Sequence, residues 1–403
     1  MINLFFVILD YSGARTYADE LLSYMVTQQD IAVHKVYLNS SYFKEYTTIK
    51  EGNMTVIHLP KIEFEFTSGK KYAKRCIDLM SPFLEEKQNI FFHLNYRKQV
   101  YLGDEARKRF GAHLIYTLHF LPNYFSYWAS EKFSGDLITT GDETEKQIIR
   151  EADHVICVTR FAKESILKWL NISEAKVTAV HNGIGERKNQ FRPLRLQKKE
   201  QVKEQLGFTK GEQLILYVGK LETRKGIKHL VTVFNRLLSK VHNARLIIAG
   251  DGNFDDVFNY AKGCWSKITL MGKIPIEEVF LLYQIADIGV IPSIFEQCSY
   301  VALEMMQYGL PVVVTAAPGL KELYTHKENA LVAPLGDPDN ATMNLEVLED
   351  EFEKMILWLL YDKKLRKKIG KNSFYNWFTN HTSKHMGQAT KMIYAQLNEI
   401  NTQ

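Results

Sequence analysis

Short apolar runs alternate with helical patterns along this chain, and the alternation occurs twice. In the first half, the strand-like runs begin at residues 3–9 and end at residues 154–158, and helical patterns such as 16–28 and 70–87 lie between most of them. This alternation predicts an α/β fold with a parallel sheet covered by helices on both faces. Ligands of such sheets bind beyond the carboxyl ends of the strands.

A polar stretch at residues 185–210 separates the two halves, and the alternation restarts at Gln213. A chain of 403 residues is too long for one ordinary α/β core, so two domains are expected. We predict Rossmann-like, doubly wound domains at residues 1–190 and 191–373. The helical tail contains an aromatic cluster that needs a packing surface, so a C-terminal helix, about residues 374–403, is expected to return to the first domain.

Composition excludes several classes of protein. The net charge of +5 is not concentrated in arginine-rich tracts, which argues against nucleic-acid binding and favours anionic small molecules or acidic lipid surfaces as partners. No apolar run reaches the roughly 18 residues of a membrane span, and the first strand lacks the features of a signal peptide. The four cysteines have no paired spacing, which argues against a disulfide framework and a zinc site. We expect a cytoplasmic protein, with a peripheral position at the inner membrane face as an alternative.

Residues 288–315 contain a strand, a polar turn, a helix and a second strand, with Glu296 in the turn and Glu304 on the helix. If Ser299 is the N-cap, Glu304 lies about a turn and a half into the helix and can point back towards Glu296. The helix N-terminus offers free N–H groups that suit a phosphate, and the two acids could accept hydrogen bonds from sugar hydroxyls. On spacing alone, a surface pair of glutamates beside a buried helix is an equally good interpretation.

Residues 219–226 follow a strand, precede a helix and contain Lys220, Arg224 and Lys225 between two glycines. Such a loop could clamp a diphosphate, although it lacks the order of a nucleotide triphosphatase loop, and a solvated basic loop is the alternative. Gly13 lies in a small-residue turn after the first strand, where a tight turn without a ligand is favoured. No GxGxxG fingerprint supports a dinucleotide cofactor.

For three further features of the sequence, an interpretation without a bound ligand is favoured. His119 ends a predicted strand at the sheet's binding edge, where most isolated histidines are structural. Asp337 and Asp339 have a metal-binding spacing, but they lie in a turn-rich loop and we reject them as metal ligands. The basic cluster at residues 70–75 could make a weak peripheral contact with a membrane, although a solvated helix face is favoured.

Together these stretches resemble the retaining GT-B glycosyltransferases of family GT4 over nearly the whole chain. The segments that carry the resemblance are the Gly13 turn, YTLHF at 116–120, HVICVT at 154–159, HNGI at 181–184, LYVGKLETRKGIKHL at 216–230, IIAGDG at 247–252, MGKI at 271–274 and EQCSYVALEMMQYGLPVVVT at 296–315. The resemblance implies two facing Rossmann-like domains with an interdomain cleft. It further implies metal-independent transfer of a sugar, without a cofactor, from a UDP- or GDP-sugar to an acceptor that the sequence leaves open: a lipid-linked glycan, a polysaccharide, a peptide or a small molecule.

The resemblance also implies roles for matched residues. Lys220 and Lys225 would neutralise the departing diphosphate, Glu296 would contact the donor sugar, and Glu304 would accept hydrogen bonds from the ribose. His119 would reach the donor sugar from the other domain. The remaining donor-binding positions are Gly13, the backbone N–H groups of Ser299, Tyr300 and Val301, and Lys273 and Ile274 beside the base.

Two departures from the family pattern concern the donor site. The family commonly has Gly-Phe-Gly where this chain has Gln297-Cys298-Ser299, and its glycine pair in the first turn is Gly13-Ala14 here. The altered segment motivates a rival prediction, a non-catalytic sugar-nucleotide-binding partner that activates another glycosyltransferase. An epimerase or phosphorylase of the same fold has no specific feature in its favour.

Overall fold

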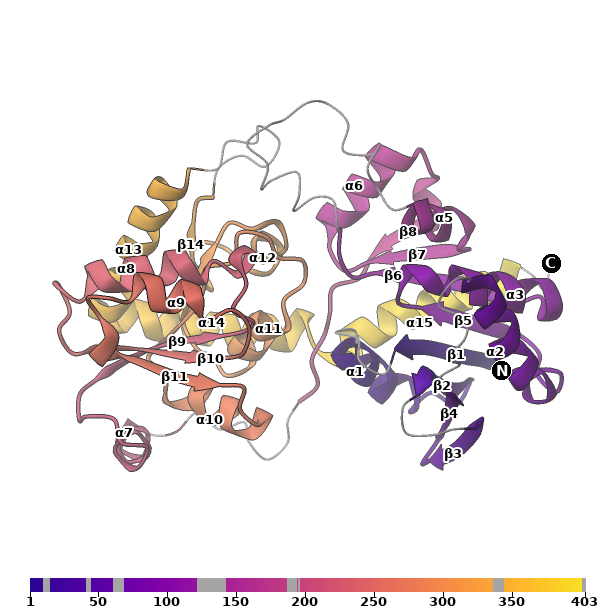
Figure 1. Ribbon diagram of the computed structural model, residues 1–403, viewed down its shortest axis with the longest axis horizontal. Coiled ribbons are helices and arrows are strands. Elements are labelled where there is room, and N and C mark those ends of the chain that lie inside the picture. The colour runs from indigo at the N-terminus through magenta and orange to yellow at the C-terminus, as the bar shows by residue number, and fades with distance from the viewer. Residues whose placement is uncertain are drawn as a thin grey trace. The chain divides into compact units, whose positions relative to one another are not determined.

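The computed structural model describes residues 1–9, 15–40, 45–60, 69–121, 143–186, 194, 196–335 and 344–400. These residues form two compact units (Figure 1). Unit 1 contains the described parts of residues 1–124, 134–185 and 383–403, and unit 2 contains those of residues 186–382. The chain therefore leaves unit 1 near Gly185 and re-enters it at Ser383.

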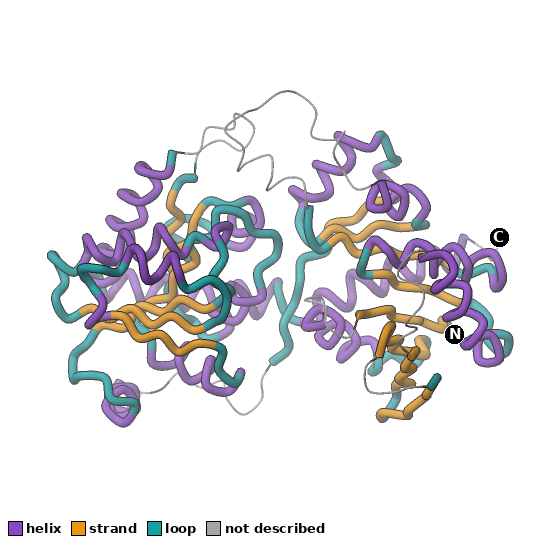
Figure 2. Tube along the Cα trace, viewed as in Figure 1, coloured by secondary structure: helices purple, strands orange, loops and turns teal. Residues whose placement is uncertain are grey.

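Unit 1 is built on an eight-stranded sheet of order β3-β4-β2-β1-β5-β6-β7-β8. All neighbouring pairs are parallel except β3 and β4, which form an antiparallel hairpin. Helices lie on both sides of the sheet (Figure 2), as expected for crossover connections. The strands are β1 (Ile2–Leu9), β2 (Ile31–Ser40), β3 (Thr47–Glu51), β4 (Met54–Pro60), β5 (Ile90–Leu94), β6 (His113–Leu118), β7 (His154–Cys157) and β8 (Val177–Ala179). The helices are α1 (Arg15–Met25), α2 (Gly69–Leu84), α3 (Val100–Phe110), α5 (Glu143–Glu151), α6 (Arg160–Leu170) and α15 (Ser383–Ile400).

Unit 2 is built on a fully parallel six-stranded sheet of order β11-β10-β9-β12-β13-β14. Its central strands are buried and rich in Val, Ile and Leu, because helices cover both faces. The strands are β9 (Gln213–Val218), β10 (Ala244–Ala249), β11 (Ile268–Gly272), β12 (Ile288–Ile291), β13 (Val312–Thr315) and β14 (Leu331–Ala333). The helices are α7 (Leu196–Gln205), α8 (Ile227–Leu237), α9 (Asp255–Tyr260), α10 (Ile276–Ile285), α11 (Tyr300–Gln307), α12 (Pro318–Leu323), α13 (Leu345–Tyr361) and α14 (Lys363–Asn380).

The predicted class of fold, two Rossmann-like α/β domains with parallel sheets, is confirmed. Strand β4 was predicted at residues 55–59, whereas β3, the outer strand of the β3–β4 hairpin, was not predicted because it is mostly exposed and gives no apolar run. The tail was predicted as one continuous helical segment, whereas the helix stops after Asn380 and restarts at Ser383. The segment that belongs to unit 1 therefore begins at Ser383, and the aromatic residues at 374–378 lie in unit 2.

The last helix, α15, lies beside α1 (Figure 1). Buried polar side chains join it to the sheet of unit 1. Nδ1 of His93, on β5, lies 2.5 Å from the hydroxyl of Tyr394, and Nε2 lies 2.6 Å from the hydroxyl of Thr117. The Thr117 hydroxyl is also 3.2 Å from that of Tyr17 on α1. All four side chains are buried, so each hydrogen bond replaces one that water would supply.

Acid should destabilise this protein partly through His93. Burial, with a smaller effect of nearby His119, lowers the pKa of His93 to about 3. The unfolded chain binds this proton near pH 6.5, so the stabilisation is complete above that pH and is lost as the pH falls towards 3. We expect His93→Gln to reduce the slope of the unfolding free energy by about 1.4 kcal/mol per pH unit between about pH 6 and pH 4. Urea unfolding at several pH values measures the slope, and an unchanged slope would contradict the assignment.

Candidate functional site

The order of strands in unit 2 reverses direction between β9 and β12. From this point, β9, β10 and β11 follow one another towards one edge of the sheet, and β12, β13 and β14 follow one another towards the other edge. Loops that leave neighbouring strands on opposite sides of such a switch point separate and form a crevice for ligands. The loop after β9 carries Lys225, and the loop after β12 carries Glu296. The two predicted charged groups therefore meet at the position where this kind of sheet binds its ligands.

Lys225 and Glu296 form an ion pair across the switch point. Nζ of Lys225 lies 2.5 Å from Oε2 of Glu296, and the same oxygen accepts a hydrogen bond from the Ser293 hydroxyl at 3.3 Å. Their side chains are 21% and 12% exposed, respectively, so the ammonium group is held in place while part of it remains accessible. A cation held in this way can receive a phosphate oxygen with little loss of side-chain entropy.

Backbone hydrogen bonds fix the Glu296 loop to its neighbours. The N–H of Ile294 donates to the carbonyl of Arg224 at 2.9 Å, and the N–H of Gly319 donates to the carbonyl of Glu296 at 3.0 Å. The Thr315 hydroxyl donates to the carbonyl of Ser293. Gly319 was not predicted as a site residue, although a Pro-Gly pair at the start of a short helix can indicate a close backbone approach.

Two glycines make these approaches possible. A Cβ atom on Gly226 would lie 1.9 Å from the carbonyl oxygen of Pro292, and one on Gly319 would lie 1.5 Å from that of Gln297. Gly226 also has φ +70°, a left-handed conformation that favours glycine. Both ends of the Glu296 loop thus rest against backbone at a distance that only glycine allows.

Helix α11 begins where predicted. Ser299 is its N-cap, and its hydroxyl accepts a hydrogen bond from the N–H of Ala302 at 3.3 Å. Tyr300 and Val301, whose N–H groups were predicted to bind phosphate, are the first two residues of the helix. These N–H groups have no acceptor within the helix, since the first turn of any helix leaves its donors without one.

Glu304 is buried, and Oε2 accepts a hydrogen bond from the Tyr283 hydroxyl at 2.7 Å. Burial, reinforced by the charge and the hydrogen bond of Glu304, raises the pKa of Tyr283 well above its usual value, so the phenol stays a donor. Tyr283, on α10, was not predicted, since it appears in the sequence as an ordinary residue of a buried helix. It holds one carboxylate oxygen of Glu304 in a defined orientation.

The remaining predicted donor-binding residues of unit 2 lie at the same edge of the sheet. Lys220 is 69% exposed at its side chain, with Nζ 3.8 Å from Oε1 of Glu222. Lys273 is exposed and Ile274 half-buried in the loop after β11. The N–H of Gly250 donates to the carbonyl of Gly272 at 2.8 Å, and the N–H of Gly219 donates to the carbonyl of Ala249 at 3.0 Å. These hydrogen bonds connect the carboxyl ends of β9, β10 and β11.

Unit 1 has its own switch point between β1 and β5. Asn95 immediately follows β5 and His119 immediately follows β6, and Nε2 of His119 lies 2.9 Å from Oδ1 of Asn95. Gly13, after β1, lies outside the described residues, as do Asp337 and Asp339. Asn95 was missed because an asparagine after a strand is typical of any turn.

The contacts of Asn95 define the protonation of His119. The amide nitrogen of Asn95 donates to the carbonyl of Val7 at 3.1 Å, so Oδ1 must face His119. Because Oδ1 can only accept, Nε2 of His119 carries the hydrogen. Burial lowers the pKa of His119 to about 4, so the ring is neutral near pH 7 and Nδ1 is its unprotonated nitrogen. This histidine is therefore arranged to accept a hydrogen bond through Nδ1.

Replacing Asn95 by aspartate should raise the pKa of His119 by at least about one unit, because a carboxylate beside an imidazole favours the charged form. Titration of the histidine ring signals by NMR measures this change. His154 is an internal control, because it bonds to the Thr178 hydroxyl at 2.9 Å and its own pKa is about 4. Equal pKa values of His119 in both proteins would contradict the assigned hydrogen bond.

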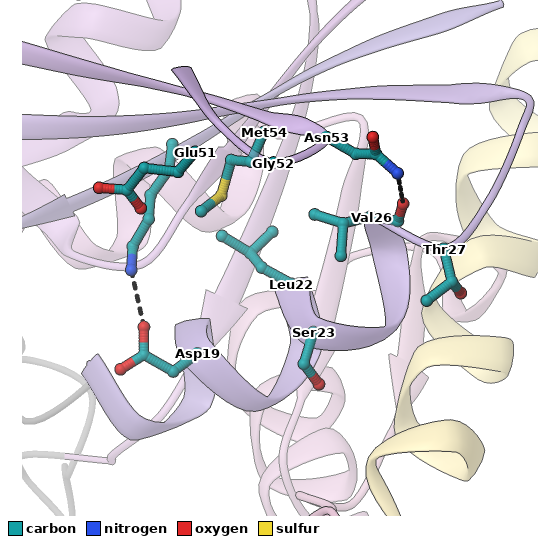
Figure 3. Close-up of a pocket in the computed structure, with 10 residues that line it drawn as sticks. Asp19, Leu22, Ser23, Val26, Thr27, Glu51, Gly52, Asn53 and Met54 are labelled. Atoms are coloured by element: carbon teal, nitrogen blue, oxygen red, sulfur yellow. Dashed lines mark hydrogen bonds and ion pairs between the residues drawn. The ribbon is translucent and has the colours of Figure 1, made fainter. Parts of the chain in front are cut away.

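A separate cavity of about 420 Å³ lies in unit 1 beside α1 and the β3–β4 hairpin (Figure 3). Leu22, Val26 and Met54 line it, and Nζ of Lys35 lies 2.7 Å from Oδ1 of Asp19 at its edge. None of the predicted site residues lines this cavity. Its one buried cation is already neutralised by an acid, so it does not have the features of an anion site.

Three other sequence features can now be placed. Lys70, Lys74 and Arg75 are exposed at the start of α2, with Nζ of Lys70 5.8 Å from the centre of the Tyr101 ring. None of the four cysteines forms a disulfide, and all four are buried. In the described residues we find no helix whose length and apolarity would allow it to cross a bilayer.

Solved structures share this fold over nearly the entire chain. Sucrose-phosphate synthase from Thermosynechococcus elongatus has a TM-score of 0.75 at 20% identity and covers 99% of this chain and 100% of that one. Anabaena Alr3699/HepE in complex with UDP has a TM-score of 0.72 at 16% identity, with coverage of 98% and 100%. The fold is accordingly that of the GT-B glycosyltransferases.

Family models agree with the fold. Residues 11–187 match the model described as Glycosyltransferase Family 4, and residues 198–374 match Glycosyl transferases group 1. The chain belongs to the GT4-like GT-B glycosyltransferases.

A relative named uncharacterized glycosyltransferase MJ1607, from Methanocaldococcus jannaschii, is 34% identical over 50% of this chain and 52% of its own. D-inositol 3-phosphate glycosyltransferase of Mycobacteroides abscessus is 25% identical over 60% of this chain and 54% of its own. The chain spans about half the length of these curated relatives.

Proposed function

We propose that this protein transfers a sugar from a nucleoside diphosphate-sugar to an acceptor, with retention of anomeric configuration and without a metal ion. The observation that carries the proposal is the Lys225–Glu296 ion pair at the switch point of unit 2, beside the N-terminus of α11. A cation, the N-terminus of a helix and a carboxylate are then close together, which suits a ligand that joins an anionic diphosphate to a hydroxylated sugar.

In the proposed reaction, the bond between the anomeric carbon and the diphosphate oxygen breaks. Negative charge develops on that oxygen, and the protein has to stabilise it. Lys225 supplies a fixed positive charge, Lys220 a mobile one, and the N–H groups of α11 supply dipoles. The acceptor hydroxyl attacks the anomeric carbon, and its proton passes to the leaving diphosphate. Glu296 and Glu304 accept hydrogen bonds from the sugar and the ribose, which positions the two ends of the donor.

The donor nucleotide is proposed by comparison with structural relatives. HepE has been crystallised with UDP and with UDP-glucose, and a structure titled trehalose-6-phosphate from E. coli contains UDP-2-fluoro glucose. These relatives are less than 25% identical to this chain, so their ligands motivate a UDP-sugar donor here and a GDP-sugar remains in the set to be tested.

A thermal-shift screen of UDP- and GDP-sugars, followed by a transfer assay with and without EDTA, tests the proposal. A true donor at about 100 times its Kd should stabilise the protein by about 2.7 kcal/mol, and the other donors should not. Transfer should continue in EDTA. Absence of stabilisation by every nucleotide-sugar would contradict the proposed site, and loss of transfer in EDTA would contradict metal independence.

The rival function, a non-catalytic partner that binds a sugar nucleotide, is motivated by the Gln297-Cys298-Ser299 segment. All three residues are buried, and Gln297 packs its backbone against Gly319. A donor that binds but is neither transferred nor hydrolysed during long incubation, alone or with candidate acceptors, would favour the rival over the enzyme.

A further inference from the structure

Helix α14 presents an exposed face that combines lysines with aromatic rings. Its buried residues, Ile369, Gly370, Ser373 and Trp377, identify the face that is turned inward, and α14 contacts α11 and α13. On the outward face, exposed residues recur at spacings of four and three: Lys364, Lys368, Lys371, Tyr375 and Phe378. Because a helix turns every 3.6 residues, these five side chains form one stripe.

The stripe carries only positive charge. Helix α14 contains no aspartate or glutamate, and exposed Lys363 and Lys367 flank the stripe. Among the described residues, none of these five lysines takes part in an ion pair, unlike Lys35, Lys203, Lys225 and Lys240. Asp362, which precedes the helix, is occupied as its N-cap, where it accepts from the N–H of Leu365 at 2.9 Å. The positive charge therefore has no internal counter-charge along the stripe.

The aromatic end of the stripe is exposed to solvent. Tyr375 is 67% exposed and Phe378 is 56% exposed. The Phe378 ring stacks on Phe374 with centroids 6.3 Å apart and lies beside the buried Trp377, which supports its position. Exposed rings next to unpaired lysines match the composition of helices that lie on membrane surfaces.

We propose that the outer face of α14 binds an anionic lipid surface. Lys364, Lys368 and Lys371 supply the attraction to acidic headgroups, and Tyr375 and Phe378 enter the interface between headgroups and acyl chains. An exposed helix face can lie along a planar surface, whereas single-stranded nucleic acid is usually held in a groove. This surface differs from the basic cluster at the start of α2, which the sequence analysis considered for a membrane contact.

Sedimentation of the full chain with vesicles tests the proposal. The protein should bind phosphatidylcholine vesicles that contain about 30% phosphatidylglycerol, and it should not bind vesicles of phosphatidylcholine alone. Binding should weaken as NaCl is raised, because salt screens the attraction. The variant Lys364→Glu/Lys368→Glu/Lys371→Glu should bind at least about ten-fold more weakly.

The start of α2 offers a matched control. Lys70→Glu/Lys74→Glu/Arg75→Glu changes the net charge by the same amount on another exposed helix, and it should leave vesicle binding within about two-fold. Unfolding by urea shows whether both charge variants keep the wild-type stability. A third variant, Tyr375→Ser/Phe378→Ser, tests the aromatic rings: it should bind vesicles more weakly and still bind heparin.

Three results would overturn the proposal: no binding of the wild-type protein to the anionic vesicles, equal losses in the α14 and α2 variants, or equal losses of vesicle and heparin binding in the aromatic variant. The second would show a dependence on net charge alone. The third would indicate a polyanion other than lipid as the partner.

Discussion

Lys225→Ala is expected to lower kcat/KM for sugar transfer by about three orders of magnitude. The side chain of Lys225 is held by Glu296 at the switch point of unit 2, so its charge is in place before the donor binds. A fixed charge needs no reorganisation when the diphosphate departs, which is why its removal should affect the transition state more than donor binding. Steady-state kinetics with the identified donor measure the effect.

The same substitution leaves Glu296 without its cation, so some stability should be lost for a reason unrelated to catalysis. Lys225→Ala/Glu296→Gln tests the effect on stability alone, because removing the charge of Glu296 as well should recover the stability that Lys225→Ala loses. Lys228→Ala is a control in the same region, since Lys228 is half-buried in the first turn of α8 and its Nζ lies 4.9 Å from the centre of the Tyr260 ring, away from Glu296. Near-normal turnover of Lys225→Ala would refute the assigned role.

Gly226→Ala is expected to disrupt the candidate site through the backbone. The new Cβ would lie 1.9 Å from the carbonyl oxygen of Pro292, so the loop after β9 and the loop after β12 would have to separate. This separation would displace Lys225 from Glu296. We expect donor binding to weaken at least about ten-fold and the unfolding free energy to fall by about 3 kcal/mol or more, a range typical of backbone strain and overpacking.

Gly211→Ala is the matched control for this prediction. Gly211 has φ +80°, and a Cβ there would meet nothing within 4 Å. The Gly211→Ala variant therefore has the strain of the left-handed conformation without the clash. Its unfolding free energy should fall by about 1 kcal/mol, and donor binding should be unchanged. Calorimetric titration with the donor and urea unfolding of both variants provide the comparison. Equal losses in the two variants would show that conformational strain, rather than the close approach to Pro292, is responsible.

The sequence predicted the features that follow from local rules. The strands of both sheets follow from apolar runs, and Ser299 as N-cap follows from the break between an apolar run and a helical pattern. The proximity of Lys225 and Glu296 follows from the rule that ligands bind beyond the carboxyl ends of parallel strands, even though the two residues are far apart in the chain.

The features that were missed depend on partners distant in sequence. Asn95 and Tyr283 are ordinary polar residues until the fold brings them to His119 and Glu304. Gly319 is one of 23 glycines, and only the position of Gln297 shows why it cannot carry a side chain. The division of the tail at Ser383 depends on which unit offers each helix a packing surface, and periodicity contains no information about that choice.

The hydrogen bond between His93 and Tyr394 has a consequence for how the chain is made. A ribosome produces the polypeptide from its first residue to its last, so β5 and α1 are complete long before α15 exists. Unit 2, by contrast, is contiguous in the described chain and has all of its elements once Asn380 has been synthesised. Synthesis of unit 1 therefore begins first and is completed last. Until α15 has been made, the surface of α1 that α15 contacts in the folded protein stays uncovered.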